Sequence, residues 1–300
     1  MQNQKILVTG SSGFIGNNII KNIKNKFFYG IGRKSKKKIN KKNLLLFKEN
    51  LFKNITVKNL NLFKIKFDFI IHCAGKGIVS NNKTEFKKNI LALKNVLDYM
   101  KKYSQKTNLI FISTLSVYGN KNKKLSEKDS LNPMSHYAKS KIKAENLCKL
   151  YSKKYNLKIL ILRVGPLYGI GLKKQFIFDA CKKISNNKNT FFGTGKEIRD
   201  YLHIDDFSFL IKKILNSKIK KFEIINVGSG KKYYIIDVIR YIKKEFSSKD
   251  KIFFNNKGSS DNPKYLLSGN TKVKKFNWKP KKKFFIELKK YILWFKSIHD

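Results

Sequence analysis

The chain has 300 residues, of which 41% are hydrophobic and 13% aromatic, a composition typical of a folded protein with a sizeable core. No apolar run approaches the ~20 residues of a membrane-spanning helix, and no signal peptide precedes the first apolar segment, so we expect a cytoplasmic protein without a membrane partner. Three cysteines without CxxC spacing (Cys73, Cys148 and Cys181) predict neither a disulfide framework nor a metal site.

The net charge of +48 arises from 67 Lys and Arg against 19 Asp and Glu. Such a surface can bind nucleic acid or another polyanion. The lysines are spread along the whole chain, however, and no recognition motif accompanies them. We therefore interpret the charge as a composition bias and do not expect a nucleic-acid partner. Arginine is rare, and we expect it where a planar, two-pronged donor is needed. The four arginines are Arg33, Arg163, Arg199 and Arg240.

Short apolar runs alternate with helical patterns in the first half of the chain, which is typical of a parallel sheet with crossover helices. The predicted strands are Lys5–Thr9, Phe27–Gly32, Leu44–Phe47, Phe67–Cys73, Leu109–Ser113, Ile159–Arg163 and, later, Glu223–Val227. The predicted helices are Phe14–Asn25, Glu85–Tyr103, Tyr137–Tyr155, Phe176–Ser185, Asp206–Leu215, Ile235–Phe246 and Phe284–Phe295. The lysine-rich segments Arg33–Lys42 and Lys279–Lys283 are predicted to be solvated loops.

A glycine-rich segment, Thr9-Gly-Ser-Ser-Gly-Phe-Ile-Gly16, joins the first predicted strand to the first helix. In this pattern Gly10 permits a tight turn, Gly13 lets the backbone approach a pyrophosphate, and Gly16 allows close packing of helix on strand. The free N–H groups at the helix start favour an anion. The expected dinucleotide contacts of this segment are Gly10, Ser12, Gly13, Phe14, Ile15 and Gly16.

The sequence thus predicts an α/β fold, a Rossmann-type doubly wound parallel sheet with a smaller C-terminal lobe. We expect residues 1–165 to form the dinucleotide-binding domain. Residues 166–300 would form the substrate-binding lobe, with some segments returning to the first domain.

The GxxGxxG spacing resembles the extended short-chain dehydrogenase/reductase family, in its nucleotide-sugar (epimerase/dehydratase) branch. The segments that repeat this resemblance in order are His72-Cys-Ala-Gly75, Asn89, Ser113-Thr-Leu-Ser-Val-Tyr-Gly119, Tyr137-Ala-Lys-Ser-Lys141, Leu162-Arg-Val-Gly-Pro-Leu-Tyr-Gly169, Arg199-Asp-Tyr-Leu-His203, Asn226-Val-Gly-Ser-Gly230 and Phe276-Asn-Trp-Lys-Pro280. They run through nearly the whole chain. The resemblance implies a nicotinamide-dependent enzyme acting on a nucleotide sugar. It also implies a homodimer formed through helices Glu85–Tyr103 and Tyr137–Tyr155.

The family's second strand usually ends in an acidic residue that binds the adenosine ribose. Here it ends in Gly32-Arg33-Lys34, and no Asp or Glu precedes Glu49. Because Arg33 suits a 2′-phosphate, the sequence favours NADP over NAD. The further cofactor contacts that the resemblance implies are Asn50, Leu51, Cys73, Ala74, Gly75 and Asn89.

Tyr137 and Lys141 lie four residues apart on a predicted helix and therefore share one face. A lysine ammonium beside a phenol favours the phenolate and lowers the pKa of the tyrosine, which suits Tyr137 to acid–base work on a sugar hydroxyl. By resemblance, Lys141 also binds the nicotinamide ribose and Thr114 hydrogen-bonds the reacting oxygen. Ser113 and Ser116 are alternatives to Thr114.

At the substrate end, Arg199 matches the family's arginine for the substrate diphosphate, with which a two-pronged donor can pair. Lys257 stands near the position at which the family usually carries a second substrate-binding arginine. Pro166 stands where the family often has an asparagine. The adjacent carboxylates Asp205 and Asp206 are interpreted as helix caps rather than as catalysts.

The leading functional prediction is a nucleotide-sugar 4-epimerase that works by hydride transfer. Leu115 and Ser116 stand where the family's dehydratases carry Asp-Glu, so water elimination is not expected. An NADPH-dependent 4-keto-sugar reductase is the alternative, because the ribose-binding acid is missing. A non-catalytic polyanion binder that reuses the fold is the alternative from another class.

Overall fold

The computed structural model describes residues 4–32, 38–41, 44–48, 50–52, 65–75, 83–257 and 262–299. The chain divides into two compact units, which are described separately. Unit 1 comprises Met1–Thr114, His136–Arg163 and Ser208–Ile225, and unit 2 comprises Leu115–Ser135, Val164–Phe207 and Asn226–Asp300.

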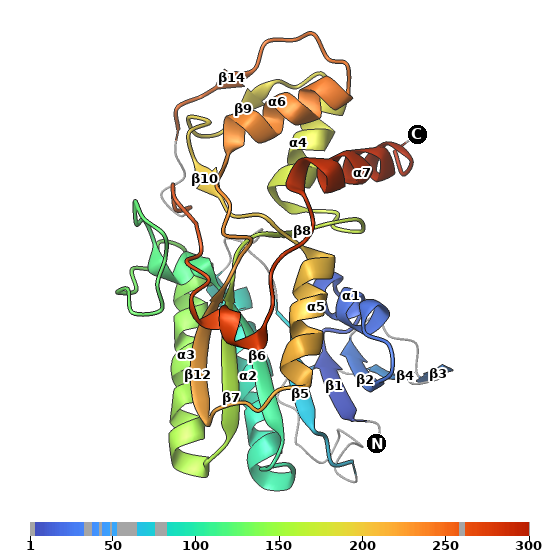
Figure 1. Cartoon of the computed structure of the whole chain (residues 1–300), viewed down its shortest axis with the longest axis vertical. Helices are drawn as coiled ribbons and strands as arrows, with labels where there is room; N and C mark the ends of the chain where they lie inside the picture. Colours follow the sequence, from blue (N-terminus) through green and yellow to red (C-terminus); the bar gives the residue numbers. More distant parts are fainter. Residues whose placement is uncertain are drawn as a thin grey trace. The chain divides into compact units, whose positions relative to one another are not determined.

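An eight-stranded sheet with the order β12-β7-β6-β5-β1-β2-β4-β3 forms the centre of the fold (Figure 1). Its strands are β1 (Lys5–Thr9), β2 (Phe27–Gly32), β3 (Lys38–Lys41), β4 (Leu44–Lys48), β5 (Phe69–His72), β6 (Asn108–Thr114), β7 (Lys158–Val164) and β12 (Phe222–Val227). Strand β1 pairs in parallel with both β2 and β5, so the strand order reverses beside it. This arrangement confirms the predicted Rossmann-type fold.

The helices of unit 1 are α1 (Phe14–Asn22), α2 (Lys83–Tyr103), α3 (His136–Tyr155) and most of α5 (Ile204–Leu215). One core cluster of unit 1 packs Leu93 and Leu97 of α2 and Cys148 of α3 with sheet residues such as Leu7 and Leu109. The alternate strand residues are buried as well, which shows that both faces of the sheet are covered. No helix among the described residues is long and apolar enough to cross a membrane.

Helix α1 and strand β3 depart most from the sequence predictions. Helix α1 ends at Asn22, three residues early, and Asn25 then adopts a left-handed backbone with φ of 63°. Lys38–Lys41, predicted as a solvated loop, forms the edge strand β3. It pairs antiparallel with β4, because backbone pairing to an open sheet edge outweighs a lysine-rich composition.

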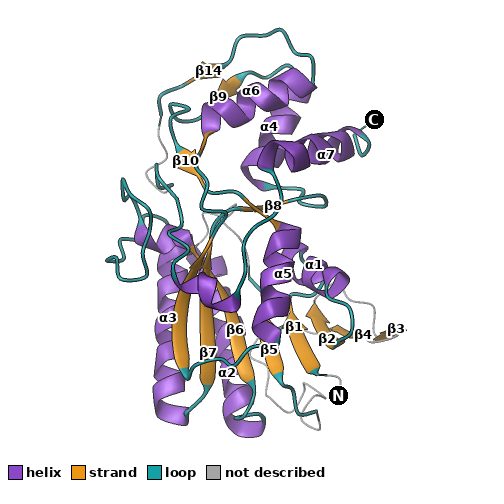
Figure 2. Ribbon diagram, in the orientation of Figure 1, coloured by secondary structure: helices purple, strands orange, loops and turns teal. Residues whose placement is uncertain are grey.

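Unit 2 contains helices packed on short two-stranded sheets (Figure 2). The helices are α4 (Gln175–Ser185), α6 (Ile235–Glu245) and α7 (Phe284–Lys296), and the start of α5 also lies in this unit. The sheets pair β8 (Leu167–Tyr168) with β11 (Leu202–His203), β9 (Thr190–Phe191) with β14 (Phe253–Phe254), and β10 (Ile198–Arg199) with β13 (Tyr233–Tyr234). Ring contacts among Tyr168, Tyr201, Tyr233 and Phe284 fill the space between these elements.

Gly16→Ala tests the packing of α1. A Cβ at Gly16 would lie 2.5 Å from the carbonyl oxygen of Gly10. This is a backbone atom, so relieving the clash would require the glycine loop itself to shift. We expect this substitution to destabilise the cofactor-free protein by about 1–3 kcal/mol. Gly75→Ala is the matched control, since its Cβ would meet nothing closer than 3.7 Å. Thermal unfolding of both variants checks the prediction, and equal midpoints would contradict it.

Candidate active site

The glycine-rich loop lies at the carboxyl end of β1. Gly10 has a φ of +68°, and a Cβ there would lie 2.9 Å from the backbone nitrogen of Ala74, so only glycine fits. The Gly13 N–H donates to the Gly10 carbonyl oxygen at 2.9 Å and closes the turn. The Ser11 hydroxyl is buried and has no hydrogen-bond partner among the described residues. An unsatisfied donor of this kind is expected where a ligand completes the site.

The start of α1 is open to an anion. Gly13 precedes the helix, no described side chain caps it, and its first turn contains no acidic residue. Free N–H groups and the helix dipole therefore favour a negatively charged group here. The six residues predicted to contact the dinucleotide all lie in this loop and first turn, with Ser12 and Gly13 exposed and Phe14 and Ile15 half-buried. These residues fit the diphosphate of a dinucleotide.

Thr9 links the ends of β1 and β5. Its hydroxyl accepts a hydrogen bond from the Ala74 N–H at 3.3 Å and lies 2.9 Å from His72 Nδ1. We infer that the hydroxyl donates its proton to Nδ1, which leaves the histidine proton on Nε2. Burial lowers the pKa of His72 to about 3, so its ring is neutral at working pH. His72 thus serves packing and cannot act as an acid near neutral pH.

The other predicted cofactor residues fall into three groups. Cys73 and Ala74 follow β5, and Gly75 lies beside Asn89 of α2, whose side chain is 9% exposed. Asn50 Oδ1 accepts the Phe52 N–H at 3.1 Å, so this oxygen stabilises the local turn from Asn50 to Phe52. The Leu51 side chain is 3% exposed and belongs to the core, which leaves only its backbone for ligand contact. Arg33 lies outside the described residues.

Tyr137 and Lys141 occupy the first two turns of α3. Lys141 Nζ donates to the Ile112 carbonyl oxygen of β6 at 2.7 Å and lies 5.8 Å from the centre of the Tyr137 ring. Thr114 ends β6 and is 8% exposed. Unit 1 therefore contains all three predicted catalytic residues, on one helix and on the strand to which Lys141 is hydrogen-bonded.

The pKa of Tyr137 differs from the expectation that Lys141 lowers it. Burial raises the pKa of Tyr137 to about 12, and burial lowers the pKa of Lys141 to about 8. Both shifts have the same cause, because a low-dielectric site disfavours each charged form. Without a ligand, the phenol is protonated at neutral pH, and Lys141 alone does not convert it to a base.

Sequence reasoning missed a buried charged pair behind these residues. Glu145 lies one helical turn after Lys141, and its carboxylate accepts hydrogen bonds from Arg163 Nη2 at 2.6 Å and from the Ser113 hydroxyl at 2.5 Å. The Ser113 hydroxyl is thus already donated to Glu145, which favours Thr114 as the substrate-facing hydroxyl. The scarcity of acidic residues and the i,i+4 spacing from Lys141 single out Glu145 in the sequence, but neither identifies its partners.

In unit 2, Arg199 lines a cavity of about 800 Å³. The arginine is 7% exposed, and its Nη1 donates to the Ile198 carbonyl oxygen at 2.8 Å. The apolar lining includes Phe191, Phe192 and Ile235, and the charged lining includes Lys183, Lys264, Asp179 and Glu197. Aromatic side chains, together with more cationic than acidic groups in the lining, suit a planar group that carries negative charge. Lys257 is exposed and does not line this cavity.

Asp200, adjacent to Arg199, is a second residue that sequence reasoning missed. It is fully buried, and its carboxylate accepts hydrogen bonds from the N–H groups of Ser229, Gly230 and Ser268. Two further segments of unit 2, Ser229–Gly230 and Ser268, are therefore held at one carboxylate next to the arginine of the cavity. Tyr118 and Tyr168 are fully buried, and the Tyr118 hydroxyl donates to Asn226 Oδ1.

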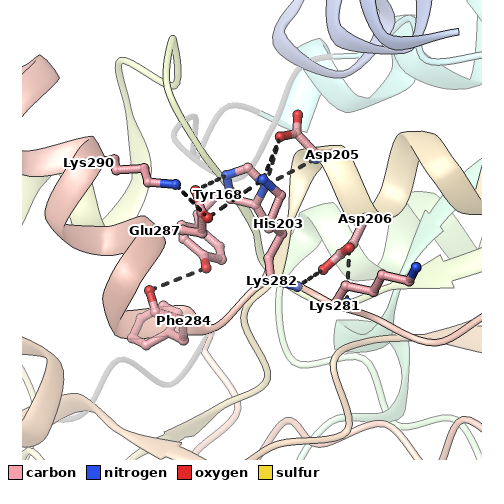
Figure 3. A network of polar contacts seen from close by, with 9 residues as sticks. All are labelled: Tyr168, His203, Asp205, Asp206, Lys281, Lys282, Phe284, Glu287 and Lys290. Atoms are coloured by element: carbon pink, nitrogen blue, oxygen red, sulfur yellow. Dashed lines mark hydrogen bonds and ion pairs between the residues drawn. The ribbon is translucent and has the colours of Figure 1, made fainter.

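The start of α5 carries a polar network that joins it to α7 (Figure 3). Asp206 lies in the first turn of α5 and also accepts the backbone N–H groups of Lys281 and Lys282, so its carboxylate ties the segment before α7 to the start of α5. His203 Nδ1 accepts the Asp205 N–H at 3.2 Å, and its Nε2 lies 3.9 Å from Glu287. Burial lowers the pKa of His203 despite the nearby carboxylates, and we interpret the network as structural.

The doubly wound sheet, the glycine loop and the Tyr–Lys pair define a dinucleotide-dependent enzyme. The model of the NAD dependent epimerase/dehydratase family matches residues 6–228. An uncharacterized UDP-glucose epimerase of Bacillus subtilis, YtcB, is 32% identical over 84% of this chain and 85% of its own length. A UDP-glucuronate 4-epimerase of Thermodesulfobacterium geofontis is 30% identical over 82% of this chain and 79% of its own length.

Among solved structures, the UDP-glucuronic acid 4-epimerase of Bacillus cereus, in complex with UDP-glucuronic acid and NAD, superposes with a TM-score of 0.86. It is 25% identical, and the match covers 98% of this chain and 100% of that enzyme. The chain belongs to the NAD dependent epimerase/dehydratase family. The resemblance seen in the motifs is thereby confirmed.

The neutral state of His72 gives a prediction about pH. With a folded-state pKa of about 3, the imidazole should not titrate between pH 5 and 8. Nuclear magnetic resonance of histidine-labelled protein checks this through the ring shifts, with the His72→Gln spectrum assigning the signal. His136, on an exposed part of the chain, is the internal comparison. A His72 signal that moves with a midpoint near 6.5 would show that the ring is solvated.

Proposed function

We propose that the chain is a nucleotide-sugar 4-epimerase that oxidises and then re-reduces one sugar carbon. The observation that carries the proposal is the placement of Tyr137, Lys141 and Thr114, with Lys141 held on a β6 carbonyl oxygen directly before that strand's terminal Ser113-Thr114. The similarity to 4-epimerases of nucleotide sugars supports the same reaction class.

Each residue has a distinct task. Tyr137 takes the proton of the sugar hydroxyl and later returns it, Thr114 hydrogen-bonds the same oxygen, and Lys141 stabilises the negative phenolate. When bound, an oxidised nicotinamide supplies the hydride acceptor and a positive charge that further favours the phenolate. This second charge is needed because burial alone raises the pKa of Tyr137 to about 12.

Arg199 is proposed to bind the substrate diphosphate, since its guanidinium lies in the wall of the unit 2 cavity. Lys257 is retained only as a more distant charge, because its side chain is exposed outside that cavity.

From the family resemblance we also propose a homodimer formed through α2 and α3. Light scattering of the purified protein tests that proposal.

Tyr137→Phe tests the assignment of the acid–base residue. We expect turnover to fall by roughly 10²–10⁴-fold, because the substitution removes the phenol proposed to move the hydroxyl proton. Cofactor affinity should change little, since the phenyl ring keeps its packing on Phe86. Epimerase assays on UDP-sugars and cofactor titration measure the two effects. Activity that survives in this variant would show that Tyr137 is not the acid–base residue.

The identity of the cofactor separates the two candidate reactions. An epimerase returns the hydride within one site and is expected to retain its cofactor, whereas a one-way reductase must exchange it. The lack of any acid before Glu49, together with Arg33, favours NADP and hence the reductase. Protein purified without added cofactor should be denatured and any released dinucleotide identified. Near-stoichiometric NAD supports the epimerase and overturns the Arg33 interpretation, while an empty protein that prefers NADPH over NADH supports the reductase.

A further inference from the structure

The buried pair formed by Glu145 and Arg163 lies where three elements of unit 1 meet. Both side chains are 4% exposed. The guanidinium binds the carboxylate with two nitrogens, Nη2 at 2.6 Å from Oε2 and Nε at 3.1 Å from Oε1. The carboxylate also accepts the Ser113 hydroxyl at 2.5 Å. Helix α3, the end of β6 and β7 are therefore connected at one charged group.

Stability alone does not explain why this site is charged. Desolvation of two ions often cancels their attraction, and well-packed apolar residues can replace such a pair without loss of stability. The position of the pair, next to the proposed catalytic residues, gives another reason for the charge. Glu145 follows Lys141 by one turn, and Ser113 directly precedes Thr114. The same carboxylate thus contacts both segments that carry the proposed catalytic groups.

The carboxylate of Glu145 also acts on Lys141. Among the described groups that influence Lys141, Cys73, Cys148 and Glu145 would each stabilise its ammonium when negatively charged. Burial raises the pKa of both cysteines, so their thiols are neutral at working pH. His72 is also neutral, because burial lowers its pKa. The charge that opposes the desolvation of Lys141 therefore comes from Glu145.

We propose that Glu145 is a positioning residue: bound to Arg163 and to the Ser113 hydroxyl, it holds helix α3 against the Thr114 end of β6 and places a negative charge one helical turn from Lys141. This inference rests on the proposed role of Tyr137 and Lys141. It assigns a task to a buried acid paired with one of the chain's four arginines.

Glu145→Gln tests the inference, because it removes the charge and keeps the size of the side chain. The first readout is the pKa of Lys141, obtained from the pH dependence of amine labelling by acetic anhydride and read on the Lys141 peptide by mass spectrometry. The wild type should show a value of about 8, and the variant a lower one. Asp237→Asn is the matched control, since Asp237 forms an exposed ion pair with Arg240.

The second readout is the pH profile of kcat/KM for epimerisation. If the pKa of Lys141 falls by about one unit, activity at pH 8 should fall about fivefold, while activity at pH 6.5 should change little. A purely structural defect would lower activity equally at both pH values. If Glu145→Gln leaves Arg163 unpaired and does not fold, the double variant E145Q/R163Q removes both charges, and the pKa of Lys141 should fall in the same direction but by less, because a cation is lost together with the anion.

The outcomes separate the inference from the proposed function. A lower pKa of Lys141 together with a loss of activity confined to high pH supports both. A lower pKa in a protein that turns over no nucleotide sugar supports the electrostatic coupling and contradicts the proposed function. An unchanged labelling pKa overturns the inference, whether activity is retained or falls equally at every pH.

Discussion

The parallel pairing of β1 with β2 on one side and β5 on the other is the constraint on which the candidate site of unit 1 depends. Because parallel strands end at the same edge, the glycine loop after β1 and the Cys73–Gly75 segment after β5 are forced together. Their backbones approach so closely that a side chain at Gly10 would collide with Ala74. The same edge receives Thr114 at the end of β6, so a helix that packs beside β6 can bring a tyrosine and a lysine to it.

Burial determines the chemistry at this edge. It moves the pKa values of Tyr137 and Lys141 in opposite directions, and each shift favours the neutral form. A neutral phenol beside a weakened ammonium is a poor general base. In the proposed mechanism the added charge comes from the bound cofactor on one side and from Glu145 on the other. Under that proposal the tyrosine is ionised only when the cofactor is present, which would limit unproductive proton transfer.

Local patterns predicted much of this arrangement from the sequence. The glycine spacing and the Tyr–Lys spacing depend on turn and helix geometry alone, so both predictions required no knowledge of distant residues. Glu145 could not be assigned in the same way, because its partners come from β6 and β7 and become neighbours only in the folded sheet. The resemblance implies Leu51 as a cofactor contact without saying through which atoms, and the structure places its side chain in the core. Strand β3 was missed because sheet-edge pairing is a non-local effect.

The contrast between abundant lysine and rare arginine has a structural counterpart within the described residues. The guanidinium of Arg163 pairs with a buried carboxylate, and Arg199 is buried in the wall of the unit 2 cavity. Lysine could not replace either without loss, because its ammonium offers no planar pair of donors. Arg240 does not follow this rule, since its side chain is 68% exposed beside Asp237. A composition bias towards lysine thus leaves arginine mainly where geometry demands it, and the diffuse charge of +48 and the specific chemistry of the fold are separate properties of the chain.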